Sequence, residues 1–177
     1  MRVWIDATGI DEDIQVFGMT LLERHLRVLS AARAAVERLP KAARKETSLP
    51  QVGACLEDLI GSRVSPTEVR IELRSGASLP EALPQELLER FPLAWSRSDE
   101  PAGRRLRAAL EDADGEPVLA LSADSLADPR LLGHLLWSDG TTAVVVGEGE
   151  ERAAVMRIEG PLPESIEEAT GLLEVAE

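Results

Sequence analysis

The sequence predicts a three-layer α/β domain with a mainly parallel sheet. Short apolar runs alternate with amphipathic segments along the chain, the order expected when helices connect parallel strands. The segment 117–122 is an uninterrupted apolar run, typical of a strand buried on both faces, and 21–39 carries one apolar stripe at helical spacing. With 177 residues, the chain is expected to form a single domain over residues 1–177.

The clearest helix signal lies in the N-terminal third of the chain. Thr20 and Glu23 form a T-x-x-E capping box. Behind them, apolar residues recur every three or four positions until Pro40, which is expected to end the helix.

Strands and helices are predicted to alternate through the rest of the chain. Asp128 and Pro129 suit the N-cap and first position of a leucine-rich helix. The Glu-rich start of the tail 163–177 suits the N-terminal end of a final helix. The other predicted elements are a strand at 3–5, a loop at 8–19, a weakly indicated helix at 52–60, a strand at 68–73, helical turns at 80–91, a strand around 93–95, a helix at 102–112, and strands at 117–122, 141–149 and 152–158.

The charge balance argues against several classes of partner and site. Asp plus Glu number 32 against 19 for Lys plus Arg, a net charge of −13. Such a field repels nucleic-acid phosphates and anionic lipids, so neither is an expected partner. The single cysteine, Cys55, excludes an internal disulfide framework, and no Cys/His cluster indicates a zinc site.

No segment of this sequence is expected to insert into a membrane. Its apolar runs are far shorter than the ~20 residues that span a bilayer. The N-terminus, MRVWIDATG, is too short and too acidic for a secretory signal. We therefore expect a cytoplasmic domain.

Two acidic residues directly follow predicted strands. Asp6 comes after the first strand and Asp124 after the apolar strand 117–122. Open α/β sheets bind ligands at the carboxyl ends of their strands, so both carboxylates would face one crevice if these strands are neighbours. Carboxylate oxygens there would suit a divalent metal and the phosphates of a nucleotide. The alternative is ordinary turn chemistry, because Asp, Ser and Gly are common where strands end.

Four stretches share a pattern with a known family: RVWIDATG at 2–9, VFGMTLLERHLRVLSAA at 16–32, VLALSADSLADPRLLGHLL at 118–136 and TAVVVGEG at 142–149. Together they resemble the Rossmann-like, GT-A-type nucleotidyltransferase fold of sugar-phosphate and alcohol-phosphate nucleotidylyltransferases. More narrowly, the chain is similar to the cytidylyltransferase-type domain that precedes the membrane domain of some CDP-alcohol phosphatidyltransferase proteins.

This resemblance implies site residues, ligands and a partner. The implied nucleotide-binding positions are Ala7, Thr8, Gly9, Ala102 and Gly103. Asp124 would bind Mg²⁺, with CTP as the nucleotide. The implied partner is a membrane-embedded CDP-alcohol phosphatidyltransferase domain, which would place this domain at the cytosolic face of the membrane.

The loop after the first strand departs from the family pattern. Active members carry an arginine in this loop and a lysine shortly before the helix, and these cations neutralise charge on the transferred group. Here the loop has neither and inserts Asp11, Glu12 and Asp13. Phe17 and Met19 stand at the lysine position.

Three functional hypotheses follow from this departure. The first is a degenerate accessory domain of phospholipid synthesis with weak or no nucleotide transfer. The second is an active CTP-dependent cytidylyltransferase that acts on an alcohol phosphate such as inositol phosphate. The third is an α/β module with an unrelated role, because fold alone does not fix function.

The remaining notable side chains are expected to be mainly structural. Arg97, Arg104 and Arg105 would supply the missing positive charge or, as the pattern favours, lie on the solvated face of an amphipathic helix. The residues expected at the surface are His25 and His134, and those expected in or near the core are Trp4, Trp95 and Trp137.

Overall fold

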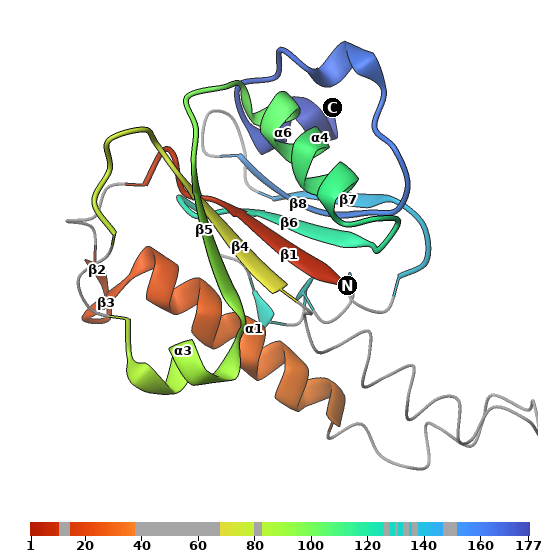
Figure 1. Cartoon of the computed structure of the whole chain (residues 1–177). Helices are drawn as coiled ribbons and strands as arrows, with labels where there is room; N and C mark the ends of the chain where they lie inside the picture. Colours follow the sequence, from red (N-terminus) through yellow and green to blue (C-terminus); the bar gives the residue numbers. More distant parts are fainter. Residues whose placement is uncertain are drawn as a thin grey trace, which may run out of the picture.

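The structure, a computed structural model, describes residues 1–10, 15–37, 68–79, 83–125, 138–146 and 152–177, together with 128, 129, 131, 132 and 135. Its centre is a six-stranded sheet with helices on both faces (Figure 1). The strands of the sheet are β1 (Arg2–Asp6), β4 (Glu68–Leu73), β5 (Leu93–Arg97), β6 (Val118–Ser122), β7 (Thr142–Val146) and β8 (Ala153–Ile158). Each strand forms at one of the predicted positions, and the α/β class is confirmed.

The sheet is mixed but mainly parallel. Its strand order is β5-β4-β1-β6-β8-β7, in which β5, β4, β1 and β6 are parallel neighbours and β8 runs antiparallel to both β6 and β7. The chain adds β4 and β5 on one side of β1 and then returns to place β6 on the other side. The order therefore reverses between β1 and β6, and open α/β sheets form their ligand crevice at such a switch point.

Two apolar cores lie on opposite faces of the sheet. The helices on the first face are α1 (Leu21–Glu37) and α3 (Gln85–Arg90), and those on the second are α4 (Ala102–Asp112) and α6 (Leu172–Ala176). Strand β1 contributes to both cores, since Val3 and Ile5 join the first and Trp4 the second, as the alternation of strand side chains requires. Trp4 is buried and Trp95 packs against the first core, as predicted.

Helix α1 begins where the capping signal predicts. The Glu23 N–H donates to Thr20 Oγ1 at 3.2 Å, which satisfies one of the donors left open in a first helical turn. The carboxylate of Glu23 pairs with Arg27, one turn further on. The predicted stop at Pro40 lies outside the described residues.

Part of the predicted loop at 8–19 is a small hairpin that leads the chain into α1. Strands β2 (Gln15–Val16) and β3 (Met19–Thr20) pair antiparallel around Phe17 and Gly18. Both turn residues have positive φ, 55° and 74°, which a two-residue type I′ turn requires.

The prediction of one continuous helix over 163–177 is wrong. The tail forms a short 3-10 helix, η1 (Glu164–Ile166), and the separate helix α6. Between them, Thr170 donates from its N–H and its hydroxyl to the carboxylate of Glu174. These local side-chain bonds replace the helical ladder at this point and separate the two elements.

Two further helix predictions fall wholly or partly outside the described residues. The weakly indicated helix at 52–60 is outside the described residues, and so are His134 and Trp137. After Asp128 the backbone is helical at 129, 131, 132 and 135, and Leu132 and Leu135 are buried in the first core. Within the described residues, no helix is both long enough and apolar enough to cross a membrane.

Candidate functional site

The carboxyl ends of β1 and β6 lie side by side. The two strands are parallel neighbours with Asp6 in register with Ser122, and the Ala123 N–H donates to the Asp6 carbonyl oxygen at 2.8 Å. The prediction that the strand ends next to Asp6 and Asp124 meet at one edge of the sheet is therefore confirmed.

The Asp6 carboxylate is held by an ion pair inside the protein. Arg105 on α4 donates to both carboxylate oxygens, Nη1 to Oδ1 and Nη2 to Oδ2, each at 2.9 Å. Thr8 adds two hydrogen bonds to Oδ1, from its N–H at 3.1 Å and its hydroxyl at 2.7 Å. Asp6 is only 8% exposed and its carboxylate is bonded to Arg105 and Thr8, so it is not free to join Asp124 at a shared metal.

The position of Arg105 corrects a second prediction. Arg105 is only 6% exposed and therefore does not lie on the solvated face of the helix, where the sequence places it. Two further donors are engaged, Nε with the Glu100 carbonyl oxygen at 2.8 Å and Nη2 with Thr8 Oγ1 at 3.3 Å, so four of the five N–H groups are hydrogen-bonded. The guanidinium lies 5.6 Å from the centre of the Trp4 ring, a cation–π contact. Arg104 is exposed on α4, in agreement with prediction, whereas Arg97 is exposed at the end of β5 and not on a helix.

Glu72 is a buried carboxylate that sequence reasoning missed. It is the register partner of Asp6 on β4, and it is 7% exposed. The indole Nε1–H of Trp4 donates to Glu72 Oε2 at 2.8 Å, and Arg105 Nη1 lies 3.9 Å from the same oxygen. Neighbouring parallel strands thus present two carboxylates to one arginine.

Asp124 offers a single exposed carboxylate beside the loop that follows β1. The Ser122 hydroxyl donates to its Oδ1, and a Cβ built on Gly9 would lie 3.7 Å from its Oδ2. Mg²⁺ commonly binds through one or two carboxylates plus substrate phosphates. In the part of the chain that the structure describes, no group of three His, Cys, Asp or Glu side chains is placed to hold a metal, and Asp6 is occupied by Arg105. A divalent metal here would have Asp124 as a protein ligand and would depend on phosphate and water oxygens for its other ligands.

His25 lies buried beside the turn that carries Asp124, contrary to the predicted surface position. It is 2% exposed, and its ring lies against the backbone of Ala123 and Ser125. Burial lowers the pKa of this imidazole from its ordinary 6.5, because the charged form loses its hydration. Hydrogen bonding to the backbone of Ser125 and Ala123, and then the Asp124 carboxylate, oppose this lowering of the pKa more weakly. The Arg24 guanidinium adds a smaller lowering.

A cavity of about 510 Å³ opens beside the loop that follows β1. The residues that define its character are Thr8, Gly9, Arg74, Asp99, Glu100 and Arg105. Two of the predicted nucleotide-binding residues, Thr8 and Gly9, therefore line a real cavity. Its charged side chains are balanced, two arginines against two carboxylates, and Arg105 is already bonded to Asp6.

The other predicted nucleotide-binding residues are enclosed by the chain itself. Ala7, Ala102 and Gly103 are buried. The Gly103 N–H donates to the Ala169 carbonyl oxygen at 3.0 Å, and a Cβ at Gly103 would lie 1.7 Å from the Ile166 carbonyl oxygen. Gly103 thus permits a close backbone approach, as its residue type suggests, but the backbone that approaches is the chain's own.

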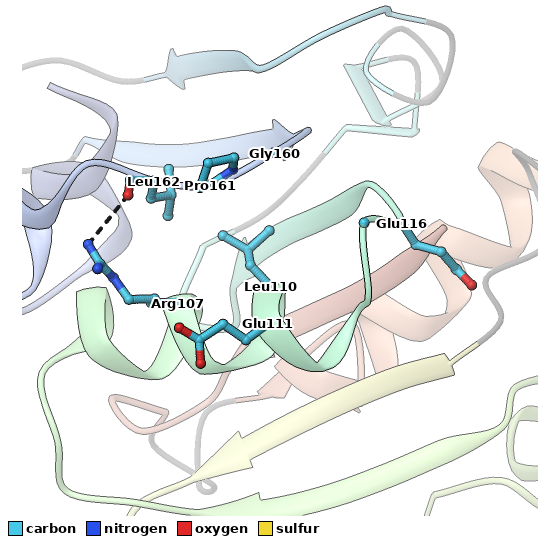
Figure 2. A pocket seen from close by; sticks show the side chains of 8 residues that line it. Arg107, Leu110, Glu111, Glu116, Gly160, Pro161 and Leu162 are labelled. Carbon is cyan, nitrogen blue, oxygen red and sulfur yellow. Dashed lines mark hydrogen bonds between the residues drawn. The ribbon is translucent and has the colours of Figure 1, made fainter.

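A second cavity, of about 250 Å³, lies at the opposite edge of the sheet (Figure 2). It is formed by the C-terminal half of α4, including Arg107 and Leu110, and by the segment after β8, where Leu162 accepts a hydrogen bond from Arg107 at 3.4 Å. It contains none of the residues that the sequence singled out.

Comparisons with known proteins do not assign the chain to a family. No protein-family model matches the chain, and no curated protein matches its sequence.

Proposed function

We propose that this chain is a degenerate nucleotidyltransferase-like domain that acts as an accessory to a CDP-alcohol phosphatidyltransferase and has weak or no nucleotide transfer of its own. The supporting observation is the ion pair between Asp6 and Arg105. At the edge of the sheet where a nucleotide would bind, one strand-end carboxylate is neutralised by the chain's own arginine at 2.9 Å.

The sheet topology supports the nucleotide-binding ancestry in this proposal. Dinucleotides and mononucleotides bind doubly wound sheets where the strand order reverses. Here the reversal lies between β1 and β6, and Gly9 and Asp124 approach each other across it. The loop after β1 and the carboxylate after β6 therefore lie next to each other, although Asp124 is not among the residues that line the 510 Å³ cavity.

The charges around the crevice support the degenerate character. Nucleotidyl transfer needs cations that stabilise the negative charge of the phosphates in the transition state. Arg105 directs four of its five N–H donors to Asp6, Thr8 and Glu100, and its Nη1 also lies 3.9 Å from Glu72, so its charge is largely committed within the protein. Asp99 and Glu100 line the same cavity and oppose an anion.

Net charge favours a protein partner over direct contact with lipid. At −13, the chain is repelled by anionic headgroups, so attachment to the cytosolic face of a membrane would have to run through a membrane-embedded protein. That inference rests on the sequence resemblance, which names the CDP-alcohol phosphatidyltransferase domain.

Calorimetric titration with CTP and MgCl₂ tests the degenerate site. We expect no saturable binding, or a Kd weaker than about 1 mM, which corresponds to about −4 kcal/mol. The matched variant is Asp124→Ala, which removes an exposed carboxylate and should leave the titration unchanged. Micromolar binding that Asp124→Ala abolishes would contradict the proposal.

The second candidate is an active cytidylyltransferase, and one observation favours it. Arg74 is exposed at the lining of the 510 Å³ cavity, and no ion pair engages its guanidinium within the described residues. An anionic acceptor such as an alcohol phosphate would find a cation there. Release of pyrophosphate from CTP in the presence of MgCl₂ and inositol phosphate, lost in Arg74→Gln, would favour this candidate.

A further inference from the structure

We propose that Arg105 is a tethered cation that replaces a divalent metal at a pair of carboxylates, Asp6 and Glu72, and so makes the floor of the crevice independent of metal ions. This deepens the proposed degenerate site by naming the residue that would make it metal-free. It concerns different atoms from Asp124, the carboxylate that the sequence resemblance implies as the metal ligand.

The two carboxylates occupy adjacent positions on neighbouring strands. Asp6 on β1 and Glu72 on β4 are register partners in a parallel pair, so their side chains emerge on the same face of the sheet. Both are buried, at 8% and 7% exposed. Two hard-oxygen donors held side by side are the usual starting point of a Mg²⁺ or Ca²⁺ site.

A buried pair of carboxylates needs a compensating positive charge, because desolvation disfavours each anion and the two repel each other. Arg105 supplies that charge from α4. Its guanidinium bonds both oxygens of Asp6 at 2.9 Å and reaches to 3.9 Å from Glu72 Oε2. The indole N–H of Trp4 also donates a hydrogen bond to Glu72 Oε2, at 2.8 Å.

The arginine stands between these carboxylates and the cavity. Arg105 and Thr8 line the 510 Å³ space, and both are bonded to Asp6. An ion that entered the cavity would meet the guanidinium before it met the carboxylates. Removal of the guanidinium would open a path from solvent to two uncompensated carboxylates.

The first test uses the unaltered protein. Melting temperature is measured in EDTA and with millimolar MgCl₂, CaCl₂ or MnCl₂, at matched ionic strength. We expect no saturable, ion-specific rise. A saturable rise that Asp6→Asn or Glu72→Gln abolishes would show that a metal already binds here, and it would overturn the proposal.

The second test removes the guanidinium. Arg105→Gln should melt at a lower temperature in EDTA and recover in a saturable way with divalent ions, and the recovery should disappear in Asp6→Asn/Arg105→Gln. Arg105→Lys is the matched control, because it keeps a positive charge at the same position and should gain no response to divalent ions. Arg104→Gln, on the exposed face of α4, should behave as the unaltered protein.

Terbium luminescence gives a second readout that reports position. Trp4 lies within hydrogen-bond distance of Glu72, so Tb³⁺ bound by Asp6 and Glu72 would be sensitised by indole excitation. Sensitised emission should appear in Arg105→Gln and fall when Trp4→Phe is added. If Arg105→Gln folds without any response to Ca²⁺, Mn²⁺ or Tb³⁺, or stays unfolded at saturating concentrations of all three, the proposal is wrong.

These outcomes are separable from those of the proposed function. Micromolar binding of CTP and Mg²⁺ that depends on Asp124 would overturn the degenerate site but would leave the responses of Arg105→Gln unaffected. Conversely, an Arg105→Gln variant that is indifferent to divalent ions would overturn only the role of Arg105.

Discussion

The guanidinium of Arg105 and the carboxylate of Asp6 form two parallel hydrogen bonds of 2.9 Å, although the residues are 99 positions apart in the sequence. This bidentate pair ties α4 to the carboxyl end of β1 and lies at the floor of the crevice. Its side chains are 4% and 9% exposed, so solvent screens the interaction weakly. The pair therefore has consequences for stability as well as for the site.

Loss of one partner of this pair should strongly destabilise the fold. Arg105→Met would leave the Asp6 carboxylate buried without its counter-charge, and such losses cost about 3–5 kcal/mol. In Asp6→Leu/Arg105→Met only part of this loss should be recovered, because Glu72, whose Oε2 lies 3.9 Å from Arg105 Nη1, loses its counter-charge as well. Urea denaturation measures both. The control is Arg104→Met, whose exposed pairs with Glu100 and Glu168 are screened by solvent and should contribute far less to stability. Equal losses at the two arginines would refute the role of burial.

Gly103 should tolerate no side chain. A Cβ at this position would lie 1.7 Å from the Ile166 carbonyl oxygen and 2.8 Å from the Ile166 carbonyl carbon, so the η1 segment would have to move away from α4. Gly103→Ala should therefore lower the free energy of unfolding by about 1–3 kcal/mol or more. Gly9→Ala is the matched control, because its Cβ would make only an ordinary contact of 3.7 Å with Asp124. Thermal melts of the two variants should differ clearly, and a Gly103→Ala protein as stable as Gly9→Ala would show that this contact is loose.

The strand and helix order was predictable because each signal is local. The apolar run of β6 and the capping box of α1 are complete within a few neighbouring residues. The pairing of β8 between β6 and β7 was not predictable in this way, since it depends on contacts between segments distant in the sequence. In the tail, Thr170 bonds Glu174 and interrupts a helix that composition alone favoured.

The site was predicted in outline and missed in detail. The rule that ligands gather at strand ends brought Asp6 and Asp124 to one edge correctly. Arg105 and His25 were misplaced because polar residue types were assigned to the surface. Both residues lie three or four positions from apolar residues of the same helix that are buried, and this spacing indicates that they belong to the buried face. The two stripes are Ala102, Arg105, Leu106 and Ala109 on α4, and Leu22, His25, Leu26 and Leu29 on α1.

The buried position of His25 predicts a loss of stability in mild acid. Its pKa in the folded protein is lowered from 6.5 by desolvation, so the unfolded chain binds the proton first as the pH falls. The neutral, buried His25 therefore contributes its full stabilisation at pH values above the pKa of histidine in the unfolded chain. This stabilisation declines as the pH falls below that value, until His25 also becomes protonated in the folded protein.

Urea denaturation across this pH range measures the effect. The unaltered protein should lose stability on acidification more steeply than His25→Gln does. Because the sequence contains only two histidines, His134→Gln leaves one imidazole signal, and its NMR titration gives the folded pKa directly. A midpoint at or above 6.5 would contradict the burial that the structure shows.

Phe17 should be replaceable with a gain in stability. Its φ of 55° is costly for a bulky side chain, by about 1 kcal/mol, and its ring is 86% exposed, so burial does not offset the cost. Phe17→Asn creates an Asn-Gly turn with Gly18, the pair that a type I′ hairpin favours. Phe17→Ala is the control, because it also removes the ring and its 5.7 Å contact with Arg24 but keeps a residue that disfavours positive φ. In urea denaturation, the asparagine variant should exceed the alanine variant by about 0.5–1 kcal/mol; equal stabilities would mean that the turn relaxes at little cost.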